Sequence, residues 1–219
     1  DASVTSQPYK TSQGVSKPYD QTIPIYIEGI GTDVIGTNKT GATDSLIGGA
    51  TGDGGTGILA KVHKGIDRAL QRLQAKLSPE FEFIHIDVFG FSRGAAAARH
   101  CIHALHNGWA VGDYYVPALR TRLVQAGAKV SELKVRFAGL YDTVASFGVA
   151  HFNDTWELSL DAVNQADQVV HLASAEEHRA NFRLTDIGNA GGQGLELYLP
   201  GVHSDIGGGY NSVPSSQTA

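Results

Sequence analysis

A serine in the stretch Gly90-Phe91-Ser92-Arg93-Gly94 has the surroundings of a hydrolase nucleophile. The pattern Gly-x-Ser-x-Gly also arises by chance in a chain with 27 glycines among 219 residues, so its context decides its weight. An apolar run over residues 83–89 leads directly into it, and an alanine-rich run follows. This order is that of a nucleophile elbow, whose sharp turn exposes the serine at the top of a sheet. Gly90 and Gly94 are expected to flank the turn because a Cβ at either position would clash with nearby backbone.

A serine nucleophile needs a histidine base, and that base needs an acid to orient it. In α/β hydrolases the chain order is serine, then acid, then histidine, with the site at the carboxyl ends of the strands. Asp142 fits the acid because it follows an apolar run over residues 134–140. Asp87 lies inside a strand, and Asp154 and Asp161 follow no clear strand. The alternative for Asp142 is a structural turn residue.

Among nine histidines, His203 fits the base because it follows an apolar run over residues 195–199 in a glycine-rich loop. The alternative is a solvent-exposed turn histidine, with Asp205 either orienting a neighbour or holding the loop. His100, His103 and His106 recur at a spacing of three, but no carboxylate or cysteine completes a metal site, so we expect a solvated helix face. No metal and no cofactor are expected.

The predicted mechanism is acyl transfer through a covalent intermediate on Ser92. The Arg93 backbone N–H is the first expected oxyanion donor, because the N-terminus of the following helix points toward the developing negative charge.

Strands separated by helices indicate βαβ units and a largely parallel sheet, hence an α/β-hydrolase-like fold with helices flanking the sheet. We expect one catalytic domain over residues 1–219, with an irregular lead-in over 1–20, a long loop over 32–57 and an aromatic loop over 109–115. The expected strands cover 22–27, 83–89, 134–140 and 195–199, and residues 169–172 are expected to form a short strand or a buried turn. The expected helices cover 58–77, 93–106, 116–126 and 175–181.

Composition excludes several classes of protein. The net charge is −5 and the basic residues are scattered, which argues against nucleic-acid binding. No apolar run is long enough to span a bilayer, and the first residues do not resemble a signal peptide. The absence of Met suggests a processed or partial chain.

Two other classes remain open. Residues 52–57 satisfy the dinucleotide pattern Gly-x-Gly-x-x-Gly before a helix, as in a nucleotide-binding oxidoreductase, although no strand precedes them and no acid follows at the required distance. A non-catalytic binding module that keeps the elbow as scaffold is the other. Within hydrolases, a carboxylesterase or thioesterase acting on a soluble acyl substrate is the alternative to a lipase.

Three separated blocks, residues 90–95, 139–146 and 200–210, resemble the catalytic domain of type VI secretion lipase effectors of the Tle1 kind. Residues 26–32 and 48–50 are similar to that family's second strand and glycine loop. By this resemblance Ser92 is the nucleophile, Asp142 the acid and His203 the base.

The resemblance implies a phospholipase of A1 or A2 type that cleaves acyl esters of membrane glycerophospholipids. It also implies secretion by the type VI apparatus without a signal peptide, action in the periplasm of a rival bacterium, and a cognate immunity protein. The family's opening strand, which ends in Phe-Asp-Gly-Thr and whose loop supplies the second oxyanion donor, has no counterpart here. Gly31 is the remaining candidate for that donor.

Overall fold

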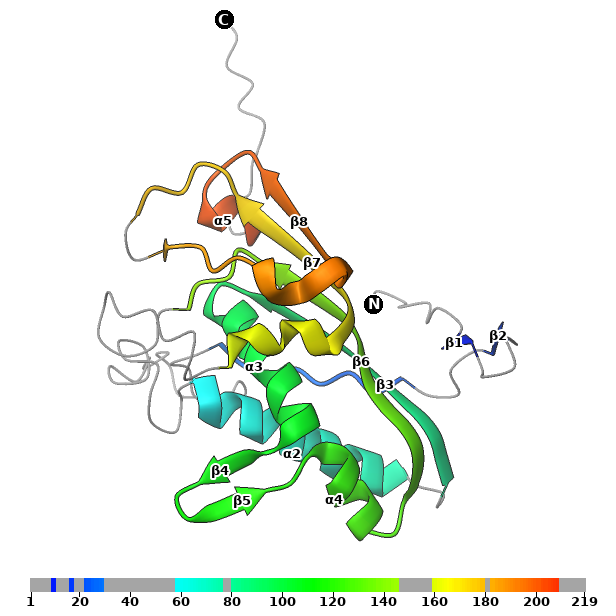
Figure 1. Cartoon of the computed structure of the whole chain (residues 1–219). Coiled ribbons are helices and arrows are strands. Elements are labelled where there is room, and N and C mark those ends of the chain that lie inside the picture. The colour runs from blue at the N-terminus through cyan, green and yellow to red at the C-terminus, as the bar shows by residue number, and fades with distance from the viewer. Residues whose placement is uncertain are drawn as a thin grey trace, which may run out of the picture.

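The computed structural model describes residues 9–10, 16–17, 22–29, 58–76, 80–145, 159–179 and 182–208. Its central sheet has four parallel strands in the order β3-β6-β7-β8 (Figure 1). These strands are β3 (Glu80–Phe91), β6 (Lys129–Tyr141), β7 (Ala166–Ser174) and β8 (Gly194–Leu199). Because all four strands run parallel, their carboxyl ends lie at the same edge of the sheet. The predicted α/β class is confirmed, and the strands are longer than their apolar runs suggested.

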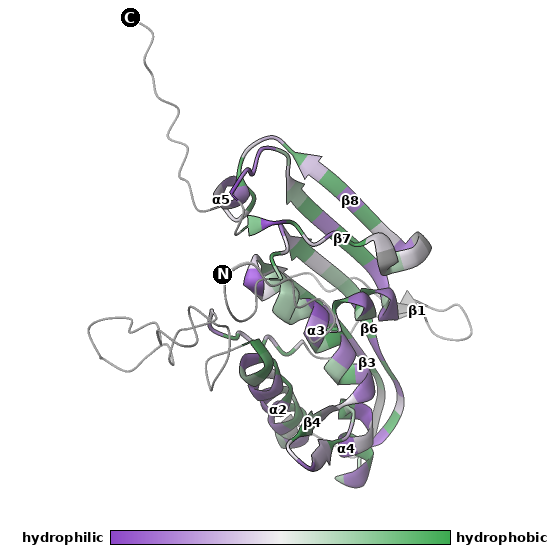
Figure 2. Cartoon of the chain, turned by 60° about the vertical axis from the view of Figure 1, so that its left-hand side comes forward, coloured by the Kyte–Doolittle hydropathy of each residue, from purple (hydrophilic) through white to green (hydrophobic). Residues whose placement is uncertain are grey.

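Helices pack against one face of this sheet (Figure 2). Helix α3 (Arg93–Asn107) lies on β3 and β6, while α2 (Ile58–Lys76) and α4 (Leu119–Gln125) pack beside α3. The buried alanines in the first half of α3, Ala95, Ala96 and Ala98, are small enough to let the helix approach the strands closely. Helix α3 therefore holds the elbow firmly against the sheet.

Side chains along the strands alternate between the two faces, as a pleated backbone requires. In β3, Ile84 is buried and Val88 packs against the core, whereas Phe89 is 62% exposed on the opposite face. On β8, Leu195 is 51% exposed. Within the described ranges, no helix is long and apolar enough to cross a membrane.

Several short elements complete the described structure. The expected aromatic loop is a hairpin of β4 (Trp109–Val111) and β5 (Tyr114–Val116), closed by a two-residue turn in which Gly112 has a φ of 56°. Within the expected lead-in, β1 (Tyr9–Lys10) pairs antiparallel with β2 (Ser16–Lys17). Two 3₁₀ helices, η2 (Leu160–Gln165) and η4 (Gly188–Gln193), precede β7 and β8, and α5 (His203–Ile206) follows β8.

The strand predicted over residues 22–27 is wrong, because the structure assigns no strand to residues 22–29. Pro24 interrupts this alternating run and has no N–H for a sheet ladder. The carbonyls of Pro24 and Tyr26 instead accept hydrogen bonds from Arg72 and Arg68 of α2. The segment is thus held by side chains of a helix rather than by a neighbouring strand.

The helix predicted over residues 175–181 is also wrong in its described part, since residues 175–179 are not helical. The Glu177 carboxylate accepts the backbone N–H of Arg179 at 2.8 Å, and this local bond replaces a helical one. The segment past the end of β7 is therefore irregular rather than helical.

One buried arginine ties α3 to the irregular segments beside it. Arg99 is 1% exposed and donates to the carbonyl oxygens of Leu160, Thr185 and Asp186 at 3.0, 3.0 and 2.8 Å. Burial lowers the pKa of its guanidinium to about 10, which leaves it charged at neutral pH.

Candidate active site

Ser92 occupies a strained turn between β3 and α3. Its φ is 58° and its ψ is −125°, an unusual conformation for a residue other than glycine. The Ser92 N–H donates to the Tyr141 carbonyl at 2.9 Å, and the Ser92 carbonyl accepts the Ala95 N–H at 3.0 Å. The first bond ties the turn to β6 and the second to the helix. The local geometry is that of a nucleophile elbow, in which strain is held in place by both flanking elements.

The two glycines of the motif differ in their surroundings. A Cβ added at Gly90 would lie 2.1 Å from the Gly94 carbonyl oxygen and 2.7 Å from the Ala95 nitrogen, so the helix turn excludes any side chain there. A Cβ at Gly94 would meet no described atom within 4 Å. The expected clash therefore exists at Gly90, whereas at Gly94 it was predicted wrongly, because that position faces outward from the turn.

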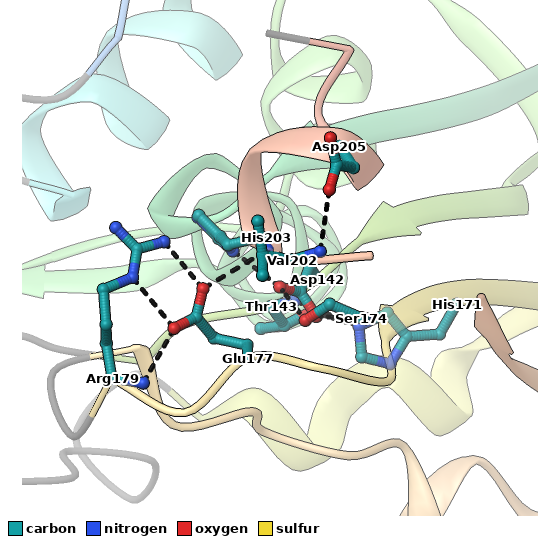
Figure 3. A network of polar contacts seen from close by, with 9 residues as sticks. All are labelled: Asp142, Thr143, His171, Ser174, Glu177, Arg179, Val202, His203 and Asp205. Carbon is teal, nitrogen blue, oxygen red and sulfur yellow. Dashed lines mark hydrogen bonds and ion pairs between the residues drawn. The ribbon is translucent and has the colours of Figure 1, made fainter. Parts of the chain in front are cut away.

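Asp142 lies directly after β6 at the carboxyl edge of the sheet and is 1% exposed. Its two carboxylate oxygens accept the Ser174 N–H and the Ser174 hydroxyl, both at 2.8 Å (Figure 3). Oδ2, the oxygen that accepts the Ser174 hydroxyl, also lies 2.6 Å from His203 Nδ1. The strand end of β7 thus orients the carboxylate, and the carboxylate orients the imidazole.

His203 begins α5 just beyond β8 and is 4% exposed. Its ring stacks on Phe91 at a centroid distance of 4.5 Å and meets the edge of Phe182 at 4.8 Å. Because Nδ1 faces the Asp142 carboxylate, Nε2 is the ring nitrogen left to accept a proton. The imidazole is therefore fixed on three sides.

A buried carboxylate also holds the backbone of the histidine segment. Glu177 Oε2 accepts the His203 N–H at 3.3 Å, and the two oxygens accept three hydrogen bonds from Arg179 (Figure 3). The hydrogen bonds from Arg179 are the largest cause that lowers the pKa of Glu177 to about 2. Asp205 caps the start of α5 by accepting the Val202 N–H at 2.8 Å, and so holds the loop.

The structure brings Ser92 and His203 to the same strand-end region, since Phe91 precedes the serine and stacks on the histidine. The Ser92 hydroxyl and His203 are not hydrogen-bonded to each other. Catalytic hydrogen bonds between nucleophile and base are often long without substrate and tighten only in the complex. The arrangement can carry out nucleophilic acyl transfer if that contact closes.

The predicted oxyanion donors are only partly located. Arg93 is the first residue of α3, so its backbone N–H lies at the helix N-terminus beside Ser92. Gly31 lies outside the described residues, as does the dinucleotide-like pattern over 52–57.

The histidines of α3 do not form the solvated face that their spacing suggested. His100 is buried because its ring packs toward His63 of α2, at a centroid distance of 5.9 Å. In the ranges that the structure describes, no three His, Cys, Asp or Glu side chains are grouped to hold a metal ion. Asp87, set aside as the acid, is ion-paired with Arg136 on the sheet.

Sequence reasoning missed the residues that hold Asp142 and the segment of His203, among them Ser174 and Glu177. Ser174 ends β7 and so shares the carboxyl edge with Asp142, a signal that was available once that strand was extended to its full length. No sequence pattern indicated that Glu177 contacts the segment of His203, and a helix was predicted at its position.

The predicted resemblance is confirmed over part of the chain. Residues 119–219 match the family model described as the catalytic domain of Tle1-like phospholipase effectors of the type VI secretion system. The matched segment contains Asp142 and His203 but not Ser92, so the nucleophile rests on the elbow geometry alone.

The chain was also compared with solved structures and with curated proteins. A crystal structure of an uncharacterized protein from Pseudomonas aeruginosa is similar, with 27% sequence identity and a TM-score of 0.41. The similarity covers 66% of this chain and 22% of that chain, so this chain corresponds to only a small part of the solved protein. None of the curated proteins matches the chain.

Proposed function

We propose that this chain is the catalytic domain of a type VI secretion effector that hydrolyses acyl esters of membrane glycerophospholipids, with A1 or A2 regiochemistry. Ser92, Asp142 and His203 are the catalytic residues of this proposal. The observation that carries it is the 2.6 Å contact between His203 Nδ1 and Asp142 Oδ2 at the strand ends. The His203 ring also stacks on Phe91, the residue before the strained Ser92. The family match over residues 119–219 supplies the substrate class.

The proposed reaction begins when His203 Nε2 takes the Ser92 proton as Oγ attacks the ester carbonyl. Asp142 fixes the tautomer of the imidazole and stabilises the imidazolium that forms. The Arg93 N–H donates to the oxyanion of the tetrahedral intermediate. His203 then protonates the leaving lysophospholipid, and water repeats the cycle on the acyl-enzyme.

The proposal extends to one catalytic domain over residues 1–219, to secretion by the type VI apparatus and to action in the periplasm of target bacteria. A membrane surface, a component of the secretion apparatus and a cognate immunity protein are the proposed partners. The support for these partners is the family match alone.

Labelling with a fluorophosphonate tests the nucleophile. We expect the label on Ser92 and none in Ser92→Ala. Asp142→Asn keeps the shape of the acid but permits the wrong histidine tautomer, so its turnover number should fall by about 10⁴-fold. Asp113→Asn in the exposed hairpin turn and His178→Ala on an exposed segment are the matched controls and should keep full labelling.

Vesicles of a phospholipid with different acyl chains at its two positions test the substrate. Release of one fatty acid with the matching lysophospholipid supports the proposal and decides between A1 and A2. Turnover of short soluble esters or thioesters without attack on vesicles favours a soluble acyl substrate instead. A folded chain that takes no label points to a binding module or an oxidoreductase.

A further inference from the structure

A second histidine–carboxylate pair, on β7 and β8, contacts the turn that carries the proposed acid. His171 of β7 is fully buried, at 0% exposure, and its Nδ1 lies 2.7 Å from Glu196 Oε1 of β8. Its Nε2 accepts the backbone N–H of Thr143 at 3.0 Å and lies 3.1 Å from the Thr143 hydroxyl (Figure 3). Thr143 immediately follows Asp142, so the pair touches the turn that carries the acid.

The partners of His171 determine which of its nitrogens bears the proton. A backbone N–H only donates, so Nε2 must present its lone pair to Thr143. The proton therefore lies on Nδ1, where it is donated to the Glu196 carboxylate. Glu196 selects the tautomer, and the tautomer supplies the acceptor for Thr143.

The turn held in this way is strained. Asp142 has a φ of 43°, in the left-handed region that residues other than glycine rarely adopt. Two consecutive N–H groups anchor it to β7, because the Asp142 N–H donates to the Leu172 carbonyl at 2.7 Å and the Thr143 N–H donates to His171. A strained backbone conformation of this kind persists only when several contacts from the surrounding structure hold it in place.

We propose that His171 and Glu196 are positioning residues of this active site. Their hydrogen-bonded pair presents an acceptor to the Thr143 N–H and so holds the strained turn that aims Asp142 at His203. The proposal rests on the function proposed for Asp142 and adds two residues that do not touch the substrate.

The pair also makes the turn sensitive to acid. Glu196 from β8, Arg99 from α3 and Asp142 from the turn after β6 face His171, and burial lowers its pKa below the ordinary value despite the opposing carboxylates. The imidazole is therefore neutral at pH 7 and takes up a proton only as pH falls through the lowered pKa. A proton on Nε2 removes the acceptor for Thr143, so the acid limb of kcat should be steeper than a single protonation makes it.

Three variants separate positioning from simple filling of space. Gln at position 171 can place an amide oxygen where Nε2 lies, so His171→Gln should keep kcat within about fivefold, because the Thr143 N–H stays paired. His171→Leu fills the site but leaves that N–H unpaired, and kcat should fall about 10-fold to 100-fold with KM unchanged. Glu196→Gln retains an acceptor for Nδ1–H and should keep kcat while moving the acid limb to lower pH.

The acid limb distinguishes these roles further, because His171→Gln removes one titrating group and should reduce its slope to that of a single protonation. Equal kcat values and pH profiles for the wild type, His171→Gln and His171→Leu would overturn the inference. A wild-type chain that no fluorophosphonate labels would overturn the proposed function, whereas a labelled wild type with an unaffected His171→Leu overturns this inference alone.

Nitrogen NMR of the full chain with labelled histidine reads the pair without any activity assay. At pH 7 we expect His171 to carry its proton on Nδ1 and to show an unprotonated Nε2. A proton on Nε2 at that pH would overturn the inference. Because this measurement uses the wild-type chain, it tests the inference even if His171→Leu does not fold.

Discussion

The close contact at Gly90 makes Gly90→Ala the sharpest test of the elbow geometry. The new Cβ would lie 2.1 Å from the Gly94 carbonyl oxygen and 2.4 Å from its carbonyl carbon. Both atoms belong to the first turn of α3, which is fixed on the sheet by its buried alanines. No flexible side chain is available to absorb the overlap, so the backbone itself must move.

The cost follows from that overlap. Overpacking a rigid site typically costs about 1–3 kcal/mol, and we expect the upper end, about 3 kcal/mol, because backbone opposes backbone. For a chain of this size each kcal/mol lowers Tm by about 2–4 °C, which gives a fall of about 6–12 °C. Relieving the contact requires a shift on the order of 1 Å beside Ser92, and such a displacement reduces reactivity by about 10²-fold.

Thermal unfolding followed by circular dichroism and the rate of fluorophosphonate labelling measure the two effects. Gly94→Ala is the matched control, since its Cβ meets no described atom within 4 Å. Alanine is favoured over glycine within a helix by about 0.5–1 kcal/mol, so the Tm of this variant should stay level or rise. A Gly90→Ala protein with wild-type Tm and labelling rate would refute the derived elbow geometry.

Three further residues give testable outcomes. Glu177→Gln should lower kcat by about 3-fold to 10-fold, because the segment that carries His203 loses a charged acceptor. The Glu177 pKa is lowered to about 2, so its stabilising contribution is present above about pH 4.5 and is lost as pH falls toward 2; in Glu177→Gln the free energy of unfolding should vary less over that range. Arg99→Leu leaves three buried carbonyls without their donor and should lower the free energy of unfolding by about 3 kcal/mol or more, measured by urea titration. Burial raises the pKa of the Cys101 thiol to about 12, so iodoacetamide at pH 8 should react slowly with the folded chain and readily in denaturant.

Each of these outcomes has a clear contradiction. A Glu177→Gln protein whose stability varies with pH as steeply as the wild type would show that another carboxylate dominates that range. An Arg99→Leu chain as stable as the wild type would mean that its carbonyl partners find water. Equal alkylation rates in the folded and unfolded states would show that the Cys101 thiol is not shielded.

Elements with strong periodicity were predictable because their patterns reflect burial directly. Helix α2 repeats its apolar residues at three and four positions, and β3 and β6 are apolar runs bounded by turn residues. The strand predicted over residues 22–27 was wrong because contacts distant in sequence replaced the local pattern there. Residues 22–29 alternate like a strand, yet their carbonyls are bound by arginines more than 40 residues away.

The candidate site divides in the same way. Motif, chain order and position after an apolar run are local properties, and they were enough to single out Ser92, Asp142 and His203. No sequence motif marked His171 or Glu196, because a polar residue within a strand is common and does not reveal which residue of a neighbouring strand it contacts. Their contact exists only because β7 and β8 pair in a register that places the two residues side by side.

The sequence by itself determined the candidates for the proposed chemistry: a serine on a glycine-flanked turn, followed in order by an aspartate and a histidine after apolar runs. Only the tertiary structure decided how those groups are held, since parallel pairing brings three distant strand ends to one edge. It also decided which glycine is indispensable, because steric exclusion at Gly90 depends on where the first turn of α3 packs. The residue types are given by the sequence, whereas the backbone strain at Ser92 and Asp142 arises only when the sheet is assembled.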